Sequence, residues 1–194
     1  MLALKGFEII LASGSPRRKA FLECLNIPFS IKTLSVDETF PSHLKGNEIA
    51  EHIVRQKSAP FSKIIKDRQI VITADTIVWC ENRYLGKPKN KEEAKEMLSF
   101  LSGKAHQVIT SVGFLSPDKF EMITETTQVY FKELSNQEID HYIEKEPPLD
   151  KAGAYGIQDW IGAIGITKIE GSYTNVVGLP LAQVEEKLRQ WLKI

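Results

Sequence analysis

The stretch that decides the fold is QIVITADTIVWC, residues 69–80. It is the most apolar part of the sequence and is rich in β-branched side chains, which predicts a central strand of a sheet. One charged residue, Asp75, interrupts it. A carboxylate in such a strand is costly to desolvate unless it is paired, binds a metal or lies where the strand leaves the core. Asp75 is therefore a candidate functional residue, and a buried carboxylate satisfied by a neighbouring lysine or backbone donor is the alternative.

Strands and helices alternate on both sides of this segment. Ser15 followed by Pro16 is typical of a helix start, and Gly103 is typical of a helix stop. Asn90 and Ser135 are each followed three residues later by glutamate, the pattern of a capping box. We expect strands over 7–12, 29–36, 106–115, 120–131 and 162–171, and helices over 16–25, 47–58, 90–103, 135–147 and from residue 181 onward. This order predicts an α/β fold with a mixed, twisted sheet flanked by helices.

The composition is that of an ordinary globular protein. The chain has 194 residues, 42% of them hydrophobic, and its 25 lysines and arginines balance 25 aspartates and glutamates. Zero net charge argues against the overall basic field of a nucleic-acid-binding protein. No apolar run approaches membrane-spanning length and no signal peptide is recognisable, so we expect a cytoplasmic protein with one domain over residues 1–194 and no membrane partner. Cys24 and Cys80 lack metal-binding spacing and are expected to be reduced thiols.

The segment LASGSPRR, residues 11–18, joins the first predicted strand to the first predicted helix and is a candidate anion site. Ser13 and Ser15 flank a glycine, so the backbone N–H groups are open to a ligand, and a helix N-terminus binds phosphate well. Arg17 and Arg18 lie in the first helical turn, where the helix dipole disfavours positive charge unless an anion is bound. A plain N-cap followed by two solvated arginines is the alternative.

Three further charged residues are candidates for the same site. Lys57 continues the apolar stripe of the 47–58 helix, so its side chain either points into a cleft or extends outward to solvent. Lys87 follows a glycine in the turn LGKP and is by itself an ordinary loop lysine. Glu38 follows a predicted strand and could pair with Asp75 to bind a hard cation such as Mg²⁺ or Mn²⁺, unless it belongs to a solvated acidic loop. From the residues alone, the sequence indicates a phosphate-binding cleft with acidic metal ligands and does not select a substrate.

Seven phrases, in order along the chain, resemble the Maf family of nucleoside triphosphate pyrophosphatases. They are LASGSPRR (11–18), VDE (36–38), RQKSA (55–59), ADTIV (74–78), LGKP (85–88), LDKAGAYGIQ (149–158) and GSYTNVVGLPL (171–181). Together they cover nearly the whole chain, which makes the resemblance far more specific than any single motif. It implies a Maf/ITPase-like fold with two lobes around a central cleft.

The resemblance also implies a reaction and its residues. The expected reaction is cleavage between the α and β phosphates of a nucleotide, giving a nucleoside monophosphate and pyrophosphate with the help of Mg²⁺ or Mn²⁺. Asp75 is implied as the proton acceptor for the attacking water and, with Glu38, as a metal ligand. The implied substrate-binding residues are Ser13, Ser15, Arg17, Arg18, Lys57 and Lys87. A homodimer is expected from the resemblance only.

Three positions resemble the branch of the family that acts on dTTP and UTP. They are Arg17, Thr76 and Gln158. A sister branch that acts on a methylated guanine nucleotide has a bulky residue other than arginine at the position of Arg17. The amide of Gln158 can match the O4 and N3–H edge of uracil or thymine by turning its own donor and acceptor. The resemblance therefore implies selection of pyrimidine nucleotides, with modified pyrimidine nucleotides as further candidates.

A regulatory role is the alternative to catalysis. The family is also linked with septum formation, so the chain could bind nucleotide as a regulator of cell division with little or no hydrolysis. The complete set of Glu38, Lys57, Asp75 and Lys87 argues against this alternative, since a pure nucleotide binder needs no metal ligands and no base.

Overall fold

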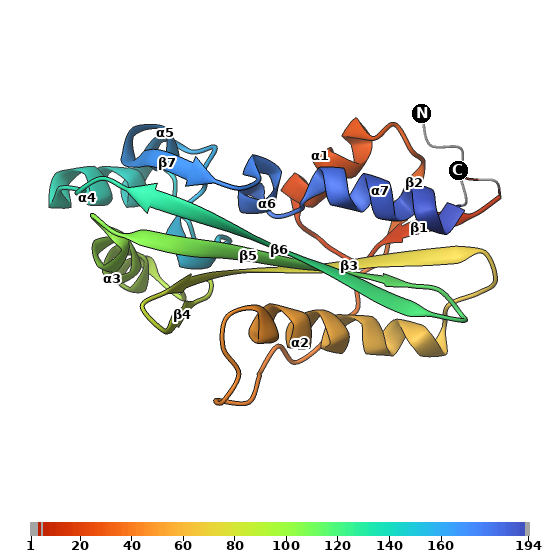
Figure 1. Cartoon of the computed structure of the whole chain (residues 1–194). Coiled ribbons are helices and arrows are strands. Elements are labelled where there is room, and N and C mark those ends of the chain that lie inside the picture. Colours follow the sequence, from red (N-terminus) through yellow and green to blue (C-terminus); the bar gives the residue numbers. More distant parts are fainter. Residues whose placement is uncertain (1–3, 5, 193–194) are drawn as a thin grey trace. The chain divides into compact units, whose positions relative to one another are not determined.

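The computed structural model describes residues 4 and 6–192 and shows an α/β fold built on a mixed sheet (Figure 1). The strand order is β2-β1-β3-β5-β6-β7, and β4 pairs with β3. β1 is parallel to β2 and β3, whereas β4 and β7 are antiparallel to their neighbours. The strands are β1 (Glu8–Leu11), β2 (Phe29–Ile31), β3 (Gln69–Cys80), β4 (Arg83–Leu85), β5 (Ala105–Leu115), β6 (Phe120–Phe131) and β7 (Ile166–Glu170). The predicted mixed α/β fold is confirmed.

The helices fall largely where the sequence predicts them. They are α1 (Pro16–Cys24), α2 (Asn47–Ser58), α3 (Lys91–Leu101), α4 (Asn136–Lys145), α5 (Trp160–Gly165), α6 (Tyr173–Val177) and α7 (Leu181–Leu192), with 3₁₀ turns η1 (Ala59–Lys63) and η2 (Ala152–Ala154). Of these, α5 and α6 were not predicted, and neither was the short strand β4. Among the described residues, no helix is both long and apolar enough to cross a membrane.

The chain divides into two compact units. The first unit comprises residues 1–75, 110–125 and 178–194, and the second comprises residues 76–109 and 126–177. The chain passes between the units within β3, β5 and β6, so each of these strands contributes residues to both. The prediction of one domain over the whole chain stays a prediction, and each unit is described by itself below.

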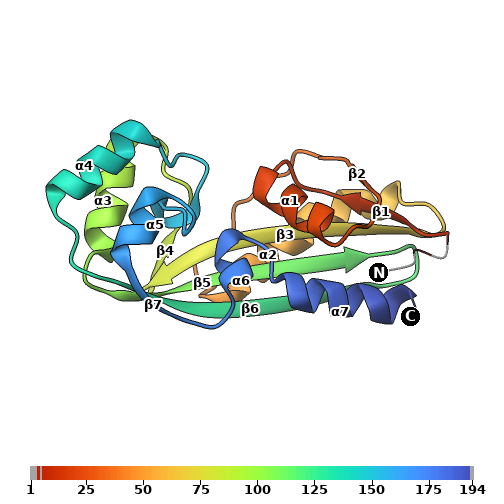
Figure 2. The ribbon, with the colours of Figure 1, turned by 90° about the horizontal axis from the view of Figure 1, so that it is seen from above.

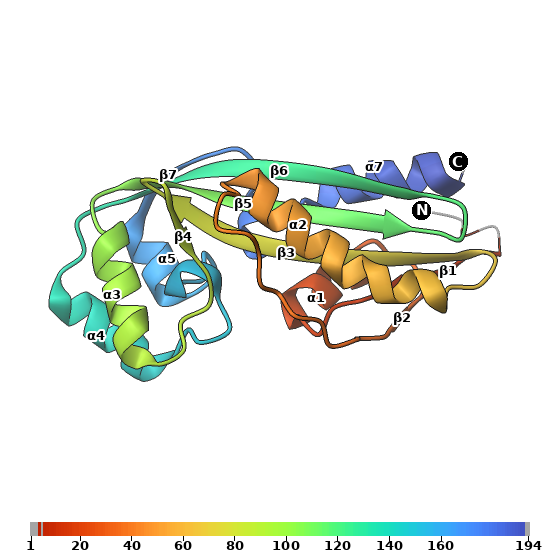
Figure 3. The ribbon, with the colours of Figure 1, turned by 90° about the horizontal axis from the view of Figure 1, so that it is seen from below.

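The sheet of the first unit carries helices on both faces. α1 and α7 cover one face, and α2 covers the other (Figures 1 and 3). Successive side chains of β3 point to opposite faces of the sheet, and this alternation decides which residue contacts which helix. Ile72 and Ala74 pack in one core cluster with Leu22 of α1 and Leu188 of α7. On the α2 face, the hydroxyls of Ser58 and Thr73 are 2.7 Å apart, so the next residue on that face of β3 is Asp75.

The second unit has its own core, formed largely by α3, α4 and the ends of the long strands. Figure 2 shows α3, α4 and α5 grouped beside these strand ends. One face of α3 is apolar and buried, with Ala94, Met97, Leu98 and Leu101 in the core cluster. Tyr142 of α4 is the largest of the fully buried side chains.

The second strand is shorter than predicted. β2 ends at Ile31, so the expectation of a strand over residues 29–36 is wrong beyond that point. The reason is its partner: β1 ends at Leu11, which pairs with Ile31, and Lys32 N–H donates a final hydrogen bond to Leu11 O at 3.1 Å. With no further strand to pair with, residues 32–46 form a loop without helix or strand.

The strand expected over residues 162–171 is wrong in its first part. α5 extends to Gly165, and β7 begins only at Ile166. A Cβ at Gly162 would lie 2.5 Å from both Gly156 O and Ile157 O. The glycine therefore marks the close approach of a helix to the preceding loop rather than a position in a strand.

The two predicted capping boxes differ. Ser135 and Glu138 form both hydrogen bonds of the box at the start of α4. At the start of α3, Asn90 Oδ1 accepts from Glu93 N–H at 2.8 Å, but the Glu93 carboxylate accepts from Lys89 N–H instead of from Asn90. The prediction of a complete box at Asn90 is therefore wrong, although the helix begins where it was expected.

His106 is a buried titratable group in the core of the second unit. It is 1% exposed, and its Nε2 is 2.7 Å from the hydroxyl of Tyr155. Its ring also makes an edge contact with Phe131, at a centroid distance of 5.1 Å. Burial lowers the pKa of His106 to about 4, so the folded protein holds this imidazole neutral at pH 7.

We predict that His106 makes the second unit less stable in acid. From pH 6.5 down to pH 4 the unfolded chain binds a proton at this imidazole that the folded protein does not, so the free energy of unfolding falls by up to about 3 kcal/mol on acidification. Urea unfolding measures the free energy of unfolding of the wild type and of His106→Gln over this pH range. The wild type should be the more stable of the two near neutral pH, and its advantage in unfolding free energy should shrink as the pH falls. Replacement of the exposed His43 by glutamine is the control, and a pH-independent difference for His106→Gln would contradict the prediction.

Candidate active site

The loop between β1 and α1 leads into a helix that begins at the predicted position. Ser15 is the N-cap, and its Oγ accepts a hydrogen bond from Arg18 N–H at 3.4 Å, while Pro16 takes the first helical position. Ser13 Oγ accepts from Ser15 N–H at 3.3 Å. Gly14 is exposed, and a Cβ built on it would meet no atom within 4 Å. The loop is therefore small, polar and accessible from outside.

Arg18 ties this loop to two other segments of the first unit. Its Nε donates to Gly178 O at 2.9 Å, and its Nη1 lies 3.0 Å from Ala74 O and 3.3 Å from Ser13 Oγ. Burial lowers the pKa of Arg18, and the carboxylate of Asp75 opposes this shift. The guanidinium stays charged at physiological pH, so a cation stands beside the start of α1.

Lys57 lies between two carboxylates. Its Nζ is 2.8 Å from Asp75 Oδ1 and 3.1 Å from Glu38 Oε1. Asp75 is only 8% exposed, whereas the Glu38 side chain is about half exposed, at 52%. The side chain of Lys57 thus points to Asp75 rather than outward to solvent. A lysine–aspartate pair alone would fit a structural role, and the second carboxylate on the same ammonium is what marks a candidate site.

The two carboxylates fit a divalent cation that is shared with a substrate. Within the described part of the chain, no group of three or more histidine, cysteine, aspartate or glutamate side chains could enclose a metal ion. Glu38 and Asp75 nevertheless converge on one cationic atom, the ammonium nitrogen of Lys57. Mg²⁺ is commonly bound by one or two carboxylates together with water and substrate phosphates, so this donor set suits such an ion but not an all-protein cage.

Arg17 is partly buried in the first turn of α1 and belongs to the first unit, whereas the other three predicted site residues belong to the second unit. Thr76 lies in β3 directly after Asp75 and is partly buried. Lys87 is exposed in the loop that follows β4, and Gln158 is exposed in the turn before α5. The structure therefore brings together, within the first unit, the residues Ser13, Ser15, Arg18, Glu38, Lys57 and Asp75, and the roles of all the predicted site residues stay predictions.

The turn that carries Gln158 is fixed on both sides by one tyrosine. The hydroxyl of Tyr142 donates to Asp159 Oδ2 at 2.6 Å and accepts from Gly156 N–H at 3.3 Å. The nearby Lys151 Nζ is 3.4 Å from the same Asp159 oxygen. Sequence reasoning missed this contact. Tyr142 occupies a core position of an amphipathic helix, and nothing in the local pattern shows where its hydroxyl points.

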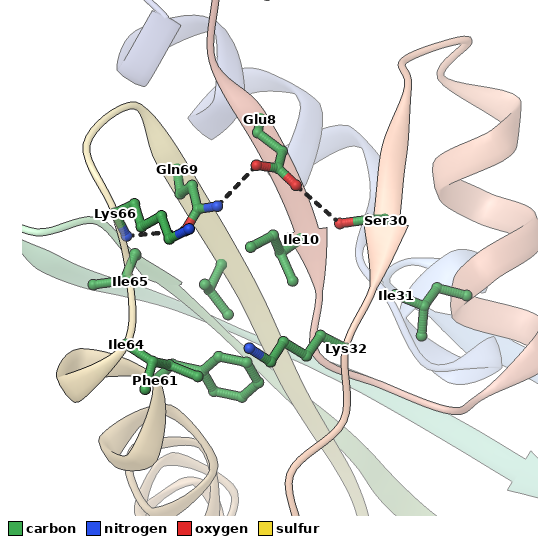
Figure 4. Close-up of a pocket in the computed structure, with 11 residues that line it drawn as sticks. Glu8, Ile10, Ser30, Ile31, Lys32, Phe61, Ile64, Ile65, Lys66 and Gln69 are labelled. Carbon is green, nitrogen blue, oxygen red and sulfur yellow. Dashed lines mark hydrogen bonds between the residues drawn. The ribbon is translucent and has the colours of Figure 1, made fainter.

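The first unit also contains a pocket of about 290 Å³ that includes none of the predicted site residues. Figure 4 shows it between β1, β2, β3 and η1, with Ile10 and Phe61 among its apolar lining. At its polar side, Glu8 accepts hydrogen bonds from Ser30 Oγ at 3.3 Å and from Gln69 Nε2 at 2.8 Å. The charged cluster of Lys57, not this pocket, carries the candidate chemistry.

Comparison with known proteins decides the family. A family model described as Maf-like protein matches residues 8–191. The chain belongs to the Maf family. A Maf relative from Christiangramia forsetii, named dTTP/UTP pyrophosphatase, is 52% identical over 97% of this chain and 96% of its own length. Another with the same name, from Flavobacterium johnsoniae, is 49% identical over 95% of each chain.

A solved structure supports the fold. The Staphylococcus aureus Ham1 protein matches this Maf chain with a TM-score of 0.52, covering 93% of this chain and 99% of its own. Its sequence is 18% identical, so the likeness concerns the fold alone. The resemblance drawn from the seven sequence phrases is confirmed for the family and for the mixed α/β fold, whereas the central cleft between two lobes stays a prediction.

We predict that Arg18→Lys destabilises the Maf chain. One ammonium cannot replace the guanidinium fork at three acceptors, so the carbonyls of Ala74 and Gly178 lose a donor, at a cost of about 1–3 kcal/mol in the free energy of unfolding. Urea unfolding measures the loss. Arg189→Lys on α7, which alters a surface i,i+4 pair with Glu185, is the matched control and should change stability by less than about 0.5 kcal/mol. If Arg18→Lys and Arg189→Lys have the same free energy of unfolding, the hydrogen bonds of Arg18 to Ala74 O and Gly178 O do not stabilise the fold as predicted.

Proposed function

We propose that this protein is a nucleoside triphosphate pyrophosphatase that hydrolyses dTTP and UTP to the nucleoside monophosphate and pyrophosphate. The observation that carries the proposal is the ammonium of Lys57 between Asp75 and Glu38, in the same unit as the open Ser13–Ser15 loop. Relatives about half identical over nearly their full lengths are named for this activity, which supports the same substrates here. A cytoplasmic location and a homodimer stay predictions from the sequence.

Glu38 and Asp75 are the residues proposed to hold the divalent cation, Mg²⁺ or Mn²⁺. When bound, such an ion supplies charge neutralisation at the phosphates. Two carboxylates without it would repel a polyphosphate. Lys57 keeps both oxygens turned toward one point, so the donor set is arranged before substrate arrives.

Asp75 is proposed to act as the proton acceptor. The oxygen of a water molecule attacks the α-phosphorus, the bond to the oxygen that bridges the α and β phosphates breaks, and pyrophosphate leaves. The proton of the water passes to the Asp75 carboxylate, whose other partner, Lys57, fixes its direction. The low exposure of Asp75 limits competing contact with bulk water.

The remaining proposed roles concern binding of the phosphates. Ser13, Ser15 and the exposed backbone at Gly14, just before α1, suit phosphate oxygens. Positive charge from Lys57, Arg17 and Arg18 adds to this. Arg18 does so from a position that is fixed by its bonds to the protein backbone. Lys87 is proposed for the same role on the strength of the LGKP motif alone.

Base selection is proposed for Arg17, Thr76 and Gln158. The amide of Gln158 can pair with the O4 and N3–H edge that thymine and uracil share. Its exposure and the hydrogen bonds that fix the turn around it suit a residue that meets a ligand. Modified pyrimidines that keep this edge are further candidate substrates.

A nucleotide panel tests the proposed function. With Mg²⁺ or Mn²⁺ present, the purified protein should release pyrophosphate from dTTP and UTP at a kcat/KM at least about a hundredfold above that for ATP and GTP, since a site that hydrogen-bonds one base edge rejects another strongly. Pyrophosphate and monophosphate are measured together to confirm the cleaved bond. Release of phosphate instead of pyrophosphate, or equal rates on all four nucleotides, would contradict the proposal.

The role of Asp75 is tested by Asp75→Asn. The amide keeps the shape of the side chain but cannot take up the proton, so kcat should fall by roughly 10²–10⁴-fold while nucleotide binding changes little. Asp118→Asn, in the exposed turn between β5 and β6, is the control and should turn over like the wild type. Melting temperatures of all three proteins verify folding. Unchanged turnover in Asp75→Asn would remove this residue from the mechanism.

A further inference from the structure

Gln56 joins α2 to the loop that carries Glu38. It directly precedes Lys57, and its Nε2 donates a hydrogen bond to Thr39 O at 2.9 Å. Thr39 follows Glu38 in the chain, so this bond holds the backbone one residue from the carboxylate. Two neighbouring residues of α2 therefore contact two neighbouring residues of the loop: Gln56 binds the backbone, and Lys57 binds the Glu38 side chain at 3.1 Å.

The loop itself forms only a local turn at this point. The Asp37 carboxylate accepts from both the N–H and the hydroxyl of Thr39, each at 3.0 Å. These bonds shape the backbone around Glu38, but they join residues of the same loop and do not fix the turn to α2. Since residues 32–46 have no strand or helix, the place of Glu38 depends on contacts such as that of Gln56.

The other end of the Gln56 amide indicates why this residue is glutamine. Its Oε1 is buried and has no hydrogen-bond partner among the described residues, which is unfavourable for a polar atom. Turning the amide over would place Oε1 against Thr39 O, two acceptors facing each other, so the donor must face the loop. In this orientation Gln56 Oε1 has no hydrogen bond among the described residues, but Nε2 keeps the hydrogen bond that holds the loop.

We propose that Gln56 is a positioning residue for the cation site formed by Glu38 and Asp75. It acts through Glu38. The hydrogen bond to Thr39 O keeps the Glu38 carboxylate close to Lys57, which also pairs with Asp75, so the two carboxylates are held together for one divalent cation. The proposal rests on the proposed function, and it adds a residue outside the set that touches the substrate or the ion.

The test compares Gln56→Met, which keeps the length of the side chain but removes the donor, with the wild type. Gln190→Met, an exposed glutamine on α7, is the matched control. Gln56→Glu is a second variant, which keeps a polar side chain but places a carboxylate against Thr39 O. Because a carboxylate cannot donate a hydrogen bond to this oxygen, the variant should show the same defect as Gln56→Met. Glu38→Gln and the double variant Glu38→Gln/Gln56→Met show whether Gln56 acts through Glu38.

Two readouts are expected to change in Gln56→Met. In the protein without cation or nucleotide, hydrogen exchange of a peptide covering residues 37–40 should become at least about tenfold faster, because the loop opens more often. The Mn²⁺ concentration for half-maximal pyrophosphate release should rise about tenfold, the usual effect of losing a contact that orients a metal ligand. The kcat at saturating Mn²⁺ should stay within about threefold. In the Glu38→Gln background, Gln56→Met should shift the Mn²⁺ requirement by less than about twofold.

Contrary results separate this proposal from the proposed function. If Gln56→Met keeps the hydrogen-exchange rate and the Mn²⁺ requirement of the wild type, the positioning role is overturned. It is also overturned if Gln56→Met raises the Mn²⁺ requirement about tenfold in the Glu38→Gln background. If the wild type releases no pyrophosphate from dTTP or UTP, the proposed function fails. Hydrogen exchange and calorimetric titration with Mn²⁺ then still decide whether Gln56 positions a cation site, because neither readout needs turnover.

Discussion

The ion pair between Lys57 and Asp75 is the contact on which the candidate site depends. A carboxylate that is 8% exposed loses most of its hydration, and without a partner it would destabilise β3 severely. The ammonium at 2.8 Å compensates for that loss and, through its second contact with Glu38, draws an exposed loop toward the strand. One lysine thus makes the buried charge tolerable and assembles two carboxylates from separate segments.

The end of β3 in the first unit is held from both faces. Asp75 points to α2 and meets Lys57, whereas the carbonyl of the preceding residue, Ala74, accepts a hydrogen bond from Arg18 of α1. Because Arg18 also binds Ser13 and Gly178, the loop before α1 and the segment before α7 are fixed to the same point. Two successive residues of β3 thus link the start of α1 to the acidic pair, Ala74 through its backbone carbonyl and Asp75 through its side chain.

Much of this could be predicted from local sequence patterns. The limits of β3 and the helix start at Ser15 and Pro16 follow from apolar periodicity and capping chemistry, which act within a few residues. The same periodicity places Lys57 on the apolar stripe of α2 but leaves the direction of its side chain open. The length of β2 could not be read in this way, since it depends on where its partner β1 ends. The contacts of Gln56 and Tyr142 were missed for the same reason: each joins segments far apart in the chain, and no local pattern records them.

The first unit carries both positive and negative side chains at the candidate site. The positive ones attract an anion such as a nucleotide, and the negative ones attract a cation. Arg17, Arg18 and Lys57 favour an anion, while Glu38 and Asp75 favour a cation, and the groups are near enough that Asp75, Arg17 and Glu38 all influence the pKa of Arg18. In the protein alone, Lys57 satisfies both carboxylates. The two carboxylates by themselves would repel a polyphosphate, so positive charge at the acidic pair favours its binding. The divalent ion proposed for Glu38 and Asp75 would supply that charge.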